Sequence, residues 1–105
     1  MFQSFDSSPQ ILHIDRPELG LTAFIVIDQP SFEISAGGVR TKIYPSNAAA
    51  LDDAKALARA MTIKCALGGL PVGGAKAVVK LHAGLRREEA FIHLGKVVDS
   101  LAGRF

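Results

Sequence analysis

Residues 61–76 read MTIKCALGGLPVGGAK, which joins the end of an apolar helix to the start of a strand. The joint between them holds four glycines and one proline. Glycine adopts backbone conformations that other residues avoid, and proline has no backbone N–H to donate, so this joint interrupts both kinds of regular structure. A helix that leads through such a turn into a strand is typical of layered α/β folds.

Upstream of this joint, three segments predict strands. Leu21–Asp28 reads LTAFIVID, a nearly continuous apolar run that favours a central strand covered on both faces. Before it, Gln10–Asp15 predicts a shorter strand, and a turn that contains proline and glycine separates the two. After it, Phe32–Tyr44 predicts a third strand, which a glycine pair interrupts.

The helix that ends in the joint begins after Pro45, with Ser46 or Asn47 as its N-cap. Its apolar residues recur at helical spacing and predict one buried stripe, formed by Leu51, Ala54, Leu57, Ala58 and Met61. Beyond the joint, Ala75–Leu81 predicts a fourth strand and Arg86–Leu101 a second helix. This alternation predicts the α/β class, a layered α/β sandwich with a mixed, largely parallel sheet.

The composition narrows the classes of function. With 105 residues there is room for one domain, residues 1–105, and 49% apolar residues suit a packed core. The net charge of +2 comes from scattered charges, so nucleic acid is not an expected partner. No apolar run is long enough to cross a bilayer and no signal peptide is visible, so no membrane partner is expected. A single cysteine suits a reducing cytoplasm.

The joint also carries the candidate chemistry. Lys64 stands near the end of the helix and Lys76 at the start of the strand, with the glycines between them. Glycine lets a backbone approach a ligand closely, and two lysines that converge beside it would form a positive pocket for a carboxylate. Two other readings compete: Lys64 as a solvated charge at a helix end, and the glycines as a phosphate-binding loop.

The phosphate-loop reading fails on the residues that follow the glycines. Ala75 stands where G-x-x-x-x-G-K-[ST] needs its lysine, and Ala77, which has no hydroxyl, follows Lys76. A phosphate loop also leads from a strand into a helix, the reverse of the order here. No G-x-G-x-x-G fingerprint occurs anywhere in the chain, so no nucleotide or cofactor site is expected in it.

Taken together, three segments match a compound pattern. They are Gly37-Gly38-Val39-Arg40, then a helix ending Ala60-Met61-Thr62-Ile63-Lys64, then Leu70-Pro71-Val72-Gly73-Gly74-Ala75-Lys76. In their order, glycine pairs and lysine separation they resemble the glutamate/leucine/phenylalanine/valine family of amino-acid dehydrogenases, and the leucine dehydrogenases most in pattern. The resemblance covers roughly residues 10–105. It implies the N-terminal substrate-binding and oligomerisation domain of such an enzyme, with the C-terminal Rossmann cofactor domain absent from this chain.

The resemblance also implies roles for individual residues. Lys76 would be the catalytic lysine that handles protons as water attacks the imino acid. Lys64 would hold the α-carboxylate of the substrate. Gly38, Gly73 and Gly74 would line the pocket and bring the backbone close to the substrate and the nicotinamide.

Ala36 is the departure that bears on specificity. Glutamate dehydrogenases typically carry a lysine at this position, where it binds the side-chain carboxylate, and a carboxylate buried against alanine would be costly. The resemblance therefore implies an apolar L-amino acid as substrate, with Arg40 bracing the loop beside the pocket. The complete enzyme would use NAD or NADP and form a homo-oligomer, whereas this chain alone would bind no cofactor and be inactive. The alternative is a non-enzymatic oligomerisation module that assembles with itself or with a full-length homologue.

The remaining candidates favour structural readings. Cys65 beside Lys64 reads as a small buried hydrophobe. The three histidines lie on different elements without ligand spacing, so they read as surface or rim residues and no metal site is expected; they are His13, His82 and His93. Three aspartates read as solvated charges: Asp15, Asp28 and Asp99.

Overall fold

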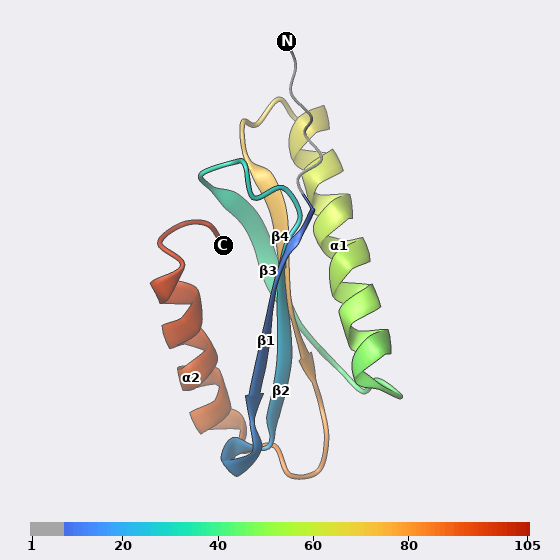
Figure 1. Cartoon of the computed structure of the whole chain (residues 1–105), viewed down its shortest axis with the longest axis vertical. Helices are drawn as coiled ribbons and strands as arrows, with labels where there is room; N and C mark the ends of the chain where they lie inside the picture. The colour runs from blue at the N-terminus through green and yellow to red at the C-terminus, as the bar shows by residue number, and fades with distance from the viewer. Residues whose placement is uncertain (1–7) are drawn as a thin grey trace.

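The computed structural model describes residues 8–105. In that part of the chain the elements are, in order, β1 (Gln10–Arg16), the 3₁₀ turn η1 (Pro17–Leu19), β2 (Leu21–Ile27), β3 (Ser35–Lys42), α1 (Asn47–Leu67), β4 (Gly73–Lys80) and α2 (Arg87–Ser100). The strands form one sheet, and Figure 1 shows it standing between the two helices. The α/β class predicted from the sequence is confirmed.

The sheet has the order β1-β2-β4-β3, with β1 and β3 at its edges. β3 and β4 pair in parallel, whereas β1–β2 and β2–β4 pair antiparallel. The sheet is mixed, as predicted, but the prediction that it is largely parallel is wrong. The helix α1 joins β3 to β4 and is long enough for a parallel crossover. Only η1 and Gly20 join β1 to β2, and so short a connection permits a hairpin alone.

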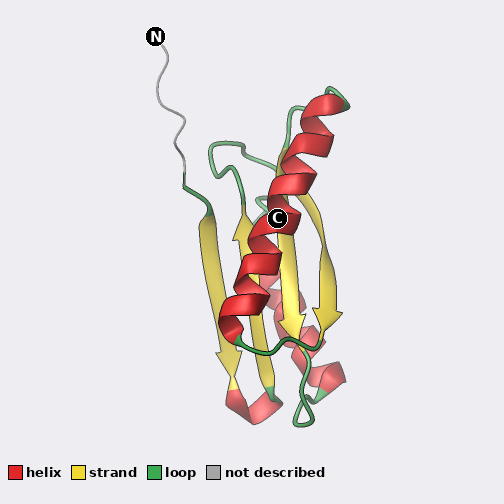
Figure 2. Cartoon of the chain, turned by 90° about the vertical axis from the view of Figure 1, so that its right-hand side faces the viewer, coloured by secondary structure: helices red, strands yellow, loops and turns green. Residues whose placement is uncertain are grey.

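The two helices cover opposite faces of the sheet and give three layers. Figure 2 looks onto α1, which crosses in front of the strands, while α2 lies behind them. The core under α2 contains Ile14, Leu21, Ala23, Ile25, Ala77, Val79, Ala90, Leu94 and Leu101. The core under α1 contains Phe24, Val26, Tyr44, Ala50, Ala54, Ala58 and Val78. The strand β2 contributes to both cores, which confirms the central position that its apolar run predicts.

The ends of the elements follow local chemistry. Ser46 is the N-cap of α1, and its side chain accepts a hydrogen bond from Ala49 N. β3 begins at Ser35 and not at Phe32, because the backbone turns there and Phe32 N donates to Gln29 O over 3.1 Å. β4 begins at Gly73, so the second glycine pair of the joint belongs to the strand and not to the turn.

In residues 8–105, neither helix combines the length and the apolarity that crossing a membrane requires.

Candidate functional site

The head of β4 lies directly beneath α1. Gly74 is buried there, and a β-carbon on it would stand 2.2 Å from Ala58 O and 2.3 Å from Thr62 N. Its N–H donates a hydrogen bond to Thr62 Oγ1 over 2.9 Å, and its carbonyl accepts one from Asp28 N over 2.9 Å. Only a residue without a side chain lets the helix come this close to the strand.

Gly73 is enclosed in a similar way. A β-carbon there would lie 3.1 Å from Phe32 Cδ2, and its N–H donates to Ile34 O over 3.1 Å. The amides of both Gly73 and Gly74 are therefore engaged within the protein. The structure gives this glycine pair a packing role, and a direct contact between either residue and a substrate stays a prediction.

Lys76 extends over the edge strand β3. In the parallel pairing Gly38 stands opposite Lys76, so both residues lie on the face of the sheet that α1 covers. Lys76 is half-buried, and its Nζ lies 3.6 Å from the place where Gly38 would carry a β-carbon. The glycine thus leaves room for the ammonium group above β3.

Lys64 lies in the last turn of α1 and is exposed. It follows Asp53 by eleven residues, or about three turns of α-helix, so the two side chains leave the helix on the same flank. Asp53 faces β3, because its Oδ2 lies 3.6 Å from Arg40 Nε. Lys64 therefore also faces the β3 side, about 16 Å farther along the helix axis than Asp53.

Ala36 completes the predicted set. It pairs with Gly74 across the sheet and shares a face with Gly38, two residues farther along β3. It is half-buried and brings no charge. Lys64 on the β3 flank of α1 and Lys76, Gly38 and Ala36 on the strands thus lie on one side of the sheet. Gly74 lies beneath the helix, whereas Gly73 packs against Phe32 and Gln29.

Comparison with known proteins identifies the family of this chain. Residues 12–105 match the Glu/Leu/Phe/Val dehydrogenase dimerisation domain. The chain belongs to the Glu/Leu/Phe/Val dehydrogenase family.

Individual relatives agree with this assignment. The chain is 38% identical over 97 residues to leucine dehydrogenase of Bacillus cereus, covering 91% of this chain and 26% of the relative. It is 33% identical over 106 residues to phenylalanine dehydrogenase of Bacillus thermotolerans, covering 100% of this chain and 28% of the relative. The crystal structure of L-tryptophan dehydrogenase from Nostoc punctiforme superposes with a TM-score of 0.84 at 33% identity, covering 93% of this chain and 30% of that one. The chain therefore spans about a quarter of the length of the curated relatives it matches.

At the other end of α1, this dehydrogenase domain holds a polar cluster of Arg40, Asp53 and Tyr44. Arg40 of β3 pairs with Asp53 of α1, and a role in bracing the loop beside the pocket stays a prediction. The hydroxyl of Tyr44 donates a hydrogen bond to the same carboxylate. Burial, and then this hydrogen bond, raise the pKa of Tyr44 to about 12. The sequence did not predict the roles of Tyr44 and Asp53, because no short motif links them.

Asp28 corrects a prediction. The sequence reads it as a solvated charge at a strand end, but the structure buries it, with 5% of its surface exposed. A carboxylate removed from water needs a partner, and Arg59 of α1 supplies one, with Nη1 3.4 Å from Asp28 Oδ2. The pair ties β2 to α1 close to the head of β4.

The weak candidates lie away from the lysines or are structural. Cys65 is a buried free thiol, as predicted. The ring of His13 stacks on Phe24 at 4.6 Å, and His82 Nδ1 accepts a hydrogen bond from Gly84 N over 3.3 Å. Across the described range, residues 8–105, no three His, Cys, Asp or Glu side chains gather as the ligands of a metal ion would.

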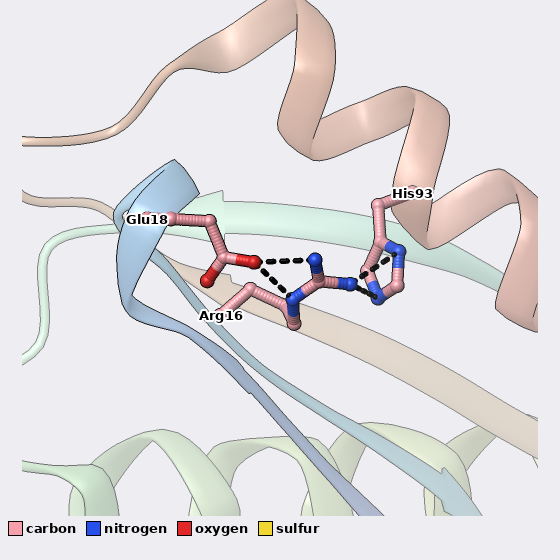
Figure 3. Close-up of polar contacts among 3 residues, drawn as sticks. All are labelled: Arg16, Glu18 and His93. Atoms are coloured by element: carbon pink, nitrogen blue, oxygen red, sulfur yellow. Dashed lines mark hydrogen bonds and ion pairs between the residues drawn. The ribbon is translucent and has the colours of Figure 1, made fainter.

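Figure 3 shows a polar cluster on the α2 side of the sheet. Arg16 of β1 lies between Glu18 of η1 and His93 of α2, with its Nη1 3.2 Å from His93 Nδ1 and its Nε 2.6 Å from Glu18 Oε2. The hydrogen bond from Arg16 lowers the pKa of Glu18 from its usual 4.5. The cluster fastens the β1–β2 hairpin to α2, so we read it as structural.

A hollow of about 640 Å³ lies on the surface of α2, lined by Arg87, Glu88, Phe91 and Ile92. The guanidinium of Arg87 sits over the ring of Phe91, 5.0 Å from its centroid. Because α2 covers the sheet face opposite to α1, this hollow is separate from the flank that carries the two lysines.

Proposed function

We propose that this chain is the substrate-binding domain of an NAD- or NADP-dependent dehydrogenase that converts an apolar L-amino acid to a 2-oxo acid and ammonia. The observation that carries the proposal is the half-buried Lys76, whose Nζ lies above Gly38 on the side of the sheet that Lys64 also faces. The similarity to leucine, phenylalanine and tryptophan dehydrogenases supports the same class of reaction.

In this proposal the two lysines have different roles, one in binding the substrate and one in proton transfer. Lys64, exposed at the end of α1, would pair its ammonium group with the α-carboxylate of the substrate in a charge-assisted contact. Lys76 lies deeper, so the reacting carbon of a substrate held by Lys64 would face its Nζ. That group would hold and move the proton as water attacks the imino carbon and ammonia departs.

Ala36 is the proposed specificity residue. It lies on the same face of β3 as Gly38 and offers no positive charge to a second carboxylate. An apolar side chain could pack against its methyl group without cost, whereas the carboxylate of glutamate would lose water with no partner. We therefore propose an apolar amino acid as substrate.

A nicotinamide cofactor would accept the hydride from Cα in the complete reaction. Residues of this chain do not fit such a cofactor, because the sequence contains no G-x-G-x-x-G fingerprint to hold a dinucleotide. The dinucleotide would be held outside these 105 residues, and the chain alone should form no NADH with leucine.

Self-association is also part of the proposal. Residues 12–105 match the dimerisation domain of the family. Large apolar side chains stand exposed on α1, among them Leu67 with 84% of its surface accessible. The same features would suit a non-enzymatic module that only assembles, and the two functions differ in whether the lysine flank binds a substrate.

Titration of the ¹⁵N-labelled chain with α-ketoisocaproate, the 2-oxo acid of leucine, followed by NMR, tests the proposal. We expect shift changes around Lys64, Lys76 and Gly38, and weaker binding by Lys64→Ala and Lys76→Ala. Lys96→Ala is the matched control, because Lys96 is exposed on α2, across the sheet. Shift changes confined to other surfaces, or equal losses in all three variants, would refute the assignment.

A second variant tests specificity. Ala36→Lys should strengthen binding of α-ketoglutarate relative to α-ketoisocaproate, because the new ammonium group would pair with the second carboxylate. An unchanged ratio of the two dissociation constants would mean that Ala36 does not face the side chain of the substrate.

A further inference from the structure

The contact between α1 and the sheet is built largely from alanine. Ala50, Ala54 and Ala58 are fully buried along the helix face that meets β2 and β4. Small apolar side chains let a helix approach closely, but apolar contact has no preferred direction. A stripe of alanines therefore sets how near α1 lies to the sheet, and it does little to set where α1 lies along the strands.

The hydroxyl of Thr62 supplies, near the end of α1, the direction that the alanines lack. Thr62 Oγ1 accepts from Gly74 N over 2.9 Å and donates to Ala58 O over 3.3 Å. Both donor and acceptor lie at the closest approach of helix and strand, where a β-carbon on Gly74 would stand 2.7 Å from Thr62 Oγ1. Because hydrogen bonds are sensitive to distance and angle, this contact fixes the register of α1 on β4.

A second polar tie lies next to the first. Asp28 N donates to Gly74 O, and the Asp28 carboxylate pairs with Arg59, which lies about one helical turn before Thr62. The peptide unit around Gly74 is thus held from α1 on one side and from β2 on the other. Arg59 is largely exposed, with 60% of its side chain accessible, so its ion pair is the weaker of the two ties.

We propose that Thr62 is a positioning residue that sets the separation of Lys64 and Lys76. Lys64 follows Thr62 by two residues of helix, and Lys76 follows Gly74 by two residues of strand, so this bond joins α1 to β4 close to both lysines. A slip of one helical turn would move Lys64 by about 5.4 Å along β4. The inference rests on the proposed function, in which one substrate must reach both ammonium groups at once.

Thr62→Val tests the proposal, because valine keeps the shape of the side chain and removes the hydroxyl. In NMR of the variant we expect about tenfold faster exchange of the Gly74 amide, altered nuclear Overhauser contacts of the Lys64 side chain, and about tenfold weaker binding of α-ketoisocaproate. Thr62→Ser should restore all three, because it keeps the hydroxyl. Thr22→Val is the matched control, since the Thr22 hydroxyl makes a long contact of 3.5 Å with Asp15 at the far end of the sheet.

The outcomes separate a positioning role from a merely structural one. If Thr62→Val deprotects the Gly74 amide but keeps the wild-type Lys64 contacts and affinity, the proposal is overturned. Thr62→Ala is made in parallel, because it leaves space for a water at the amide and can fold where valine does not. If neither variant folds, the hydroxyl serves the fold itself and the positioning role is again overturned.

Failure of the proposed function would look different. Wild-type chain that does not bind α-ketoisocaproate at the lysines would refute the function. The Overhauser contacts of Lys64 would still report whether Thr62 sets its place relative to β4, so the two failures cannot be confused.

Discussion

The two faces of the sheet are covered in contrasting ways. Under α2, the core contains large side chains: Leu21 and Ile25 of β2 share one cluster with Leu94 of α2 and with Leu101, which follows the helix. Under α1, the helix contributes alanines, and the strand β4 contributes Gly74 at the point of closest approach. Polar ties at both ends of α1 then fix its position.

This difference indicates that one face of the sheet contributes mainly to the stability of the fold and the other mainly to the position of α1. Large buried aliphatic groups remove the most apolar surface from water, so the α2 face should supply most of the hydrophobic stabilisation. A helix that packs through alanine and glycine lies close to the sheet, where short polar contacts can reach across. The α1 face, which carries the candidate site, is therefore the face on which polar contacts fix the position of a helix. The variants below test this difference between the two faces.

The largest effect is expected on the α2 face. Leu94→Ala removes a side chain that is 2% exposed and should lower the free energy of unfolding by about 3 kcal/mol, from lost burial and the cavity left behind. Ile92→Ala on the same helix is the control, because Ile92 is 55% exposed, and it should change stability by less than about 0.5 kcal/mol. Urea denaturation measures both. Similar losses of unfolding free energy in the two variants would mean that burial under α2 does not supply the expected stabilisation.

On the α1 face, Gly74→Ala should cost about 2 kcal/mol, because the new β-carbon would meet backbone atoms of α1 at 2.2 and 2.3 Å. The matched control is Gly95→Ala on α2, where a β-carbon meets nothing within 4 Å. That change should stabilise the protein by about 0.5 to 1 kcal/mol, because alanine favours a helix interior. Thermal unfolding of both variants decides whether close packing at Gly74 is needed.

Tyr44→Phe should cost about 1 kcal/mol near neutral pH, through loss of the hydrogen bond to Asp53. The folded pKa of Tyr44, about 12, lies above its ordinary value of 10.0. The phenol therefore stabilises the fold fully below pH 10, and this contribution disappears as the pH rises from 10 to 12. Urea denaturation across that window should show a steeper loss in wild type than in Tyr44→Phe.

A direct titration checks the same residue. Tyr44 is the only tyrosine of the chain, so ultraviolet absorbance follows its phenolate without interference. A midpoint near 10 in the folded protein would contradict the buried hydrogen bond.

The smallest effect is expected from Glu18→Gln in the cluster of Figure 3. The pKa of Glu18 is lowered from 4.5, first by the hydrogen bond from Arg16, so its contribution is present above pH 4.5 and is lost as the pH falls through the folded pKa. The variant should lose a little stability at neutral pH and flatten the acid limb of the profile. Glu33→Gln, at another exposed carboxylate, is the matched control.

Local patterns predicted much of the chain. Ser46 caps α1 because a hydroxyl before a helix can bond its free amides, a rule that needs only neighbouring residues. The apolar run of β2 likewise predicted a strand buried on both faces. For the candidate site, the sequence shows the spacing of Lys64 and Lys76 around the glycines, and the structure places Lys76 opposite Gly38 of β3.

Contacts between distant residues could not be predicted in this way. The pair of Asp28 and Arg59 spans 31 residues, and nothing beside either of them marks it. Gly74 was expected to line a pocket, but its need for glycine comes from the helix that lies on it. The bond from its amide to Thr62 depends on the packing of α1 on β4, which no nearby residue specifies.

The sequence by itself determined the order of helices and strands, the N-cap of α1 and the two lysines that flank the joint, because each depends on residues close together in the chain. The tertiary structure alone decided the strand order, the antiparallel pairing of β2 with β4 and the polar ties that set α1 over the strands. The physical reason is that strand pairing and helix packing are chosen by the sum of many weak contacts between remote segments. No short stretch of sequence contains that sum.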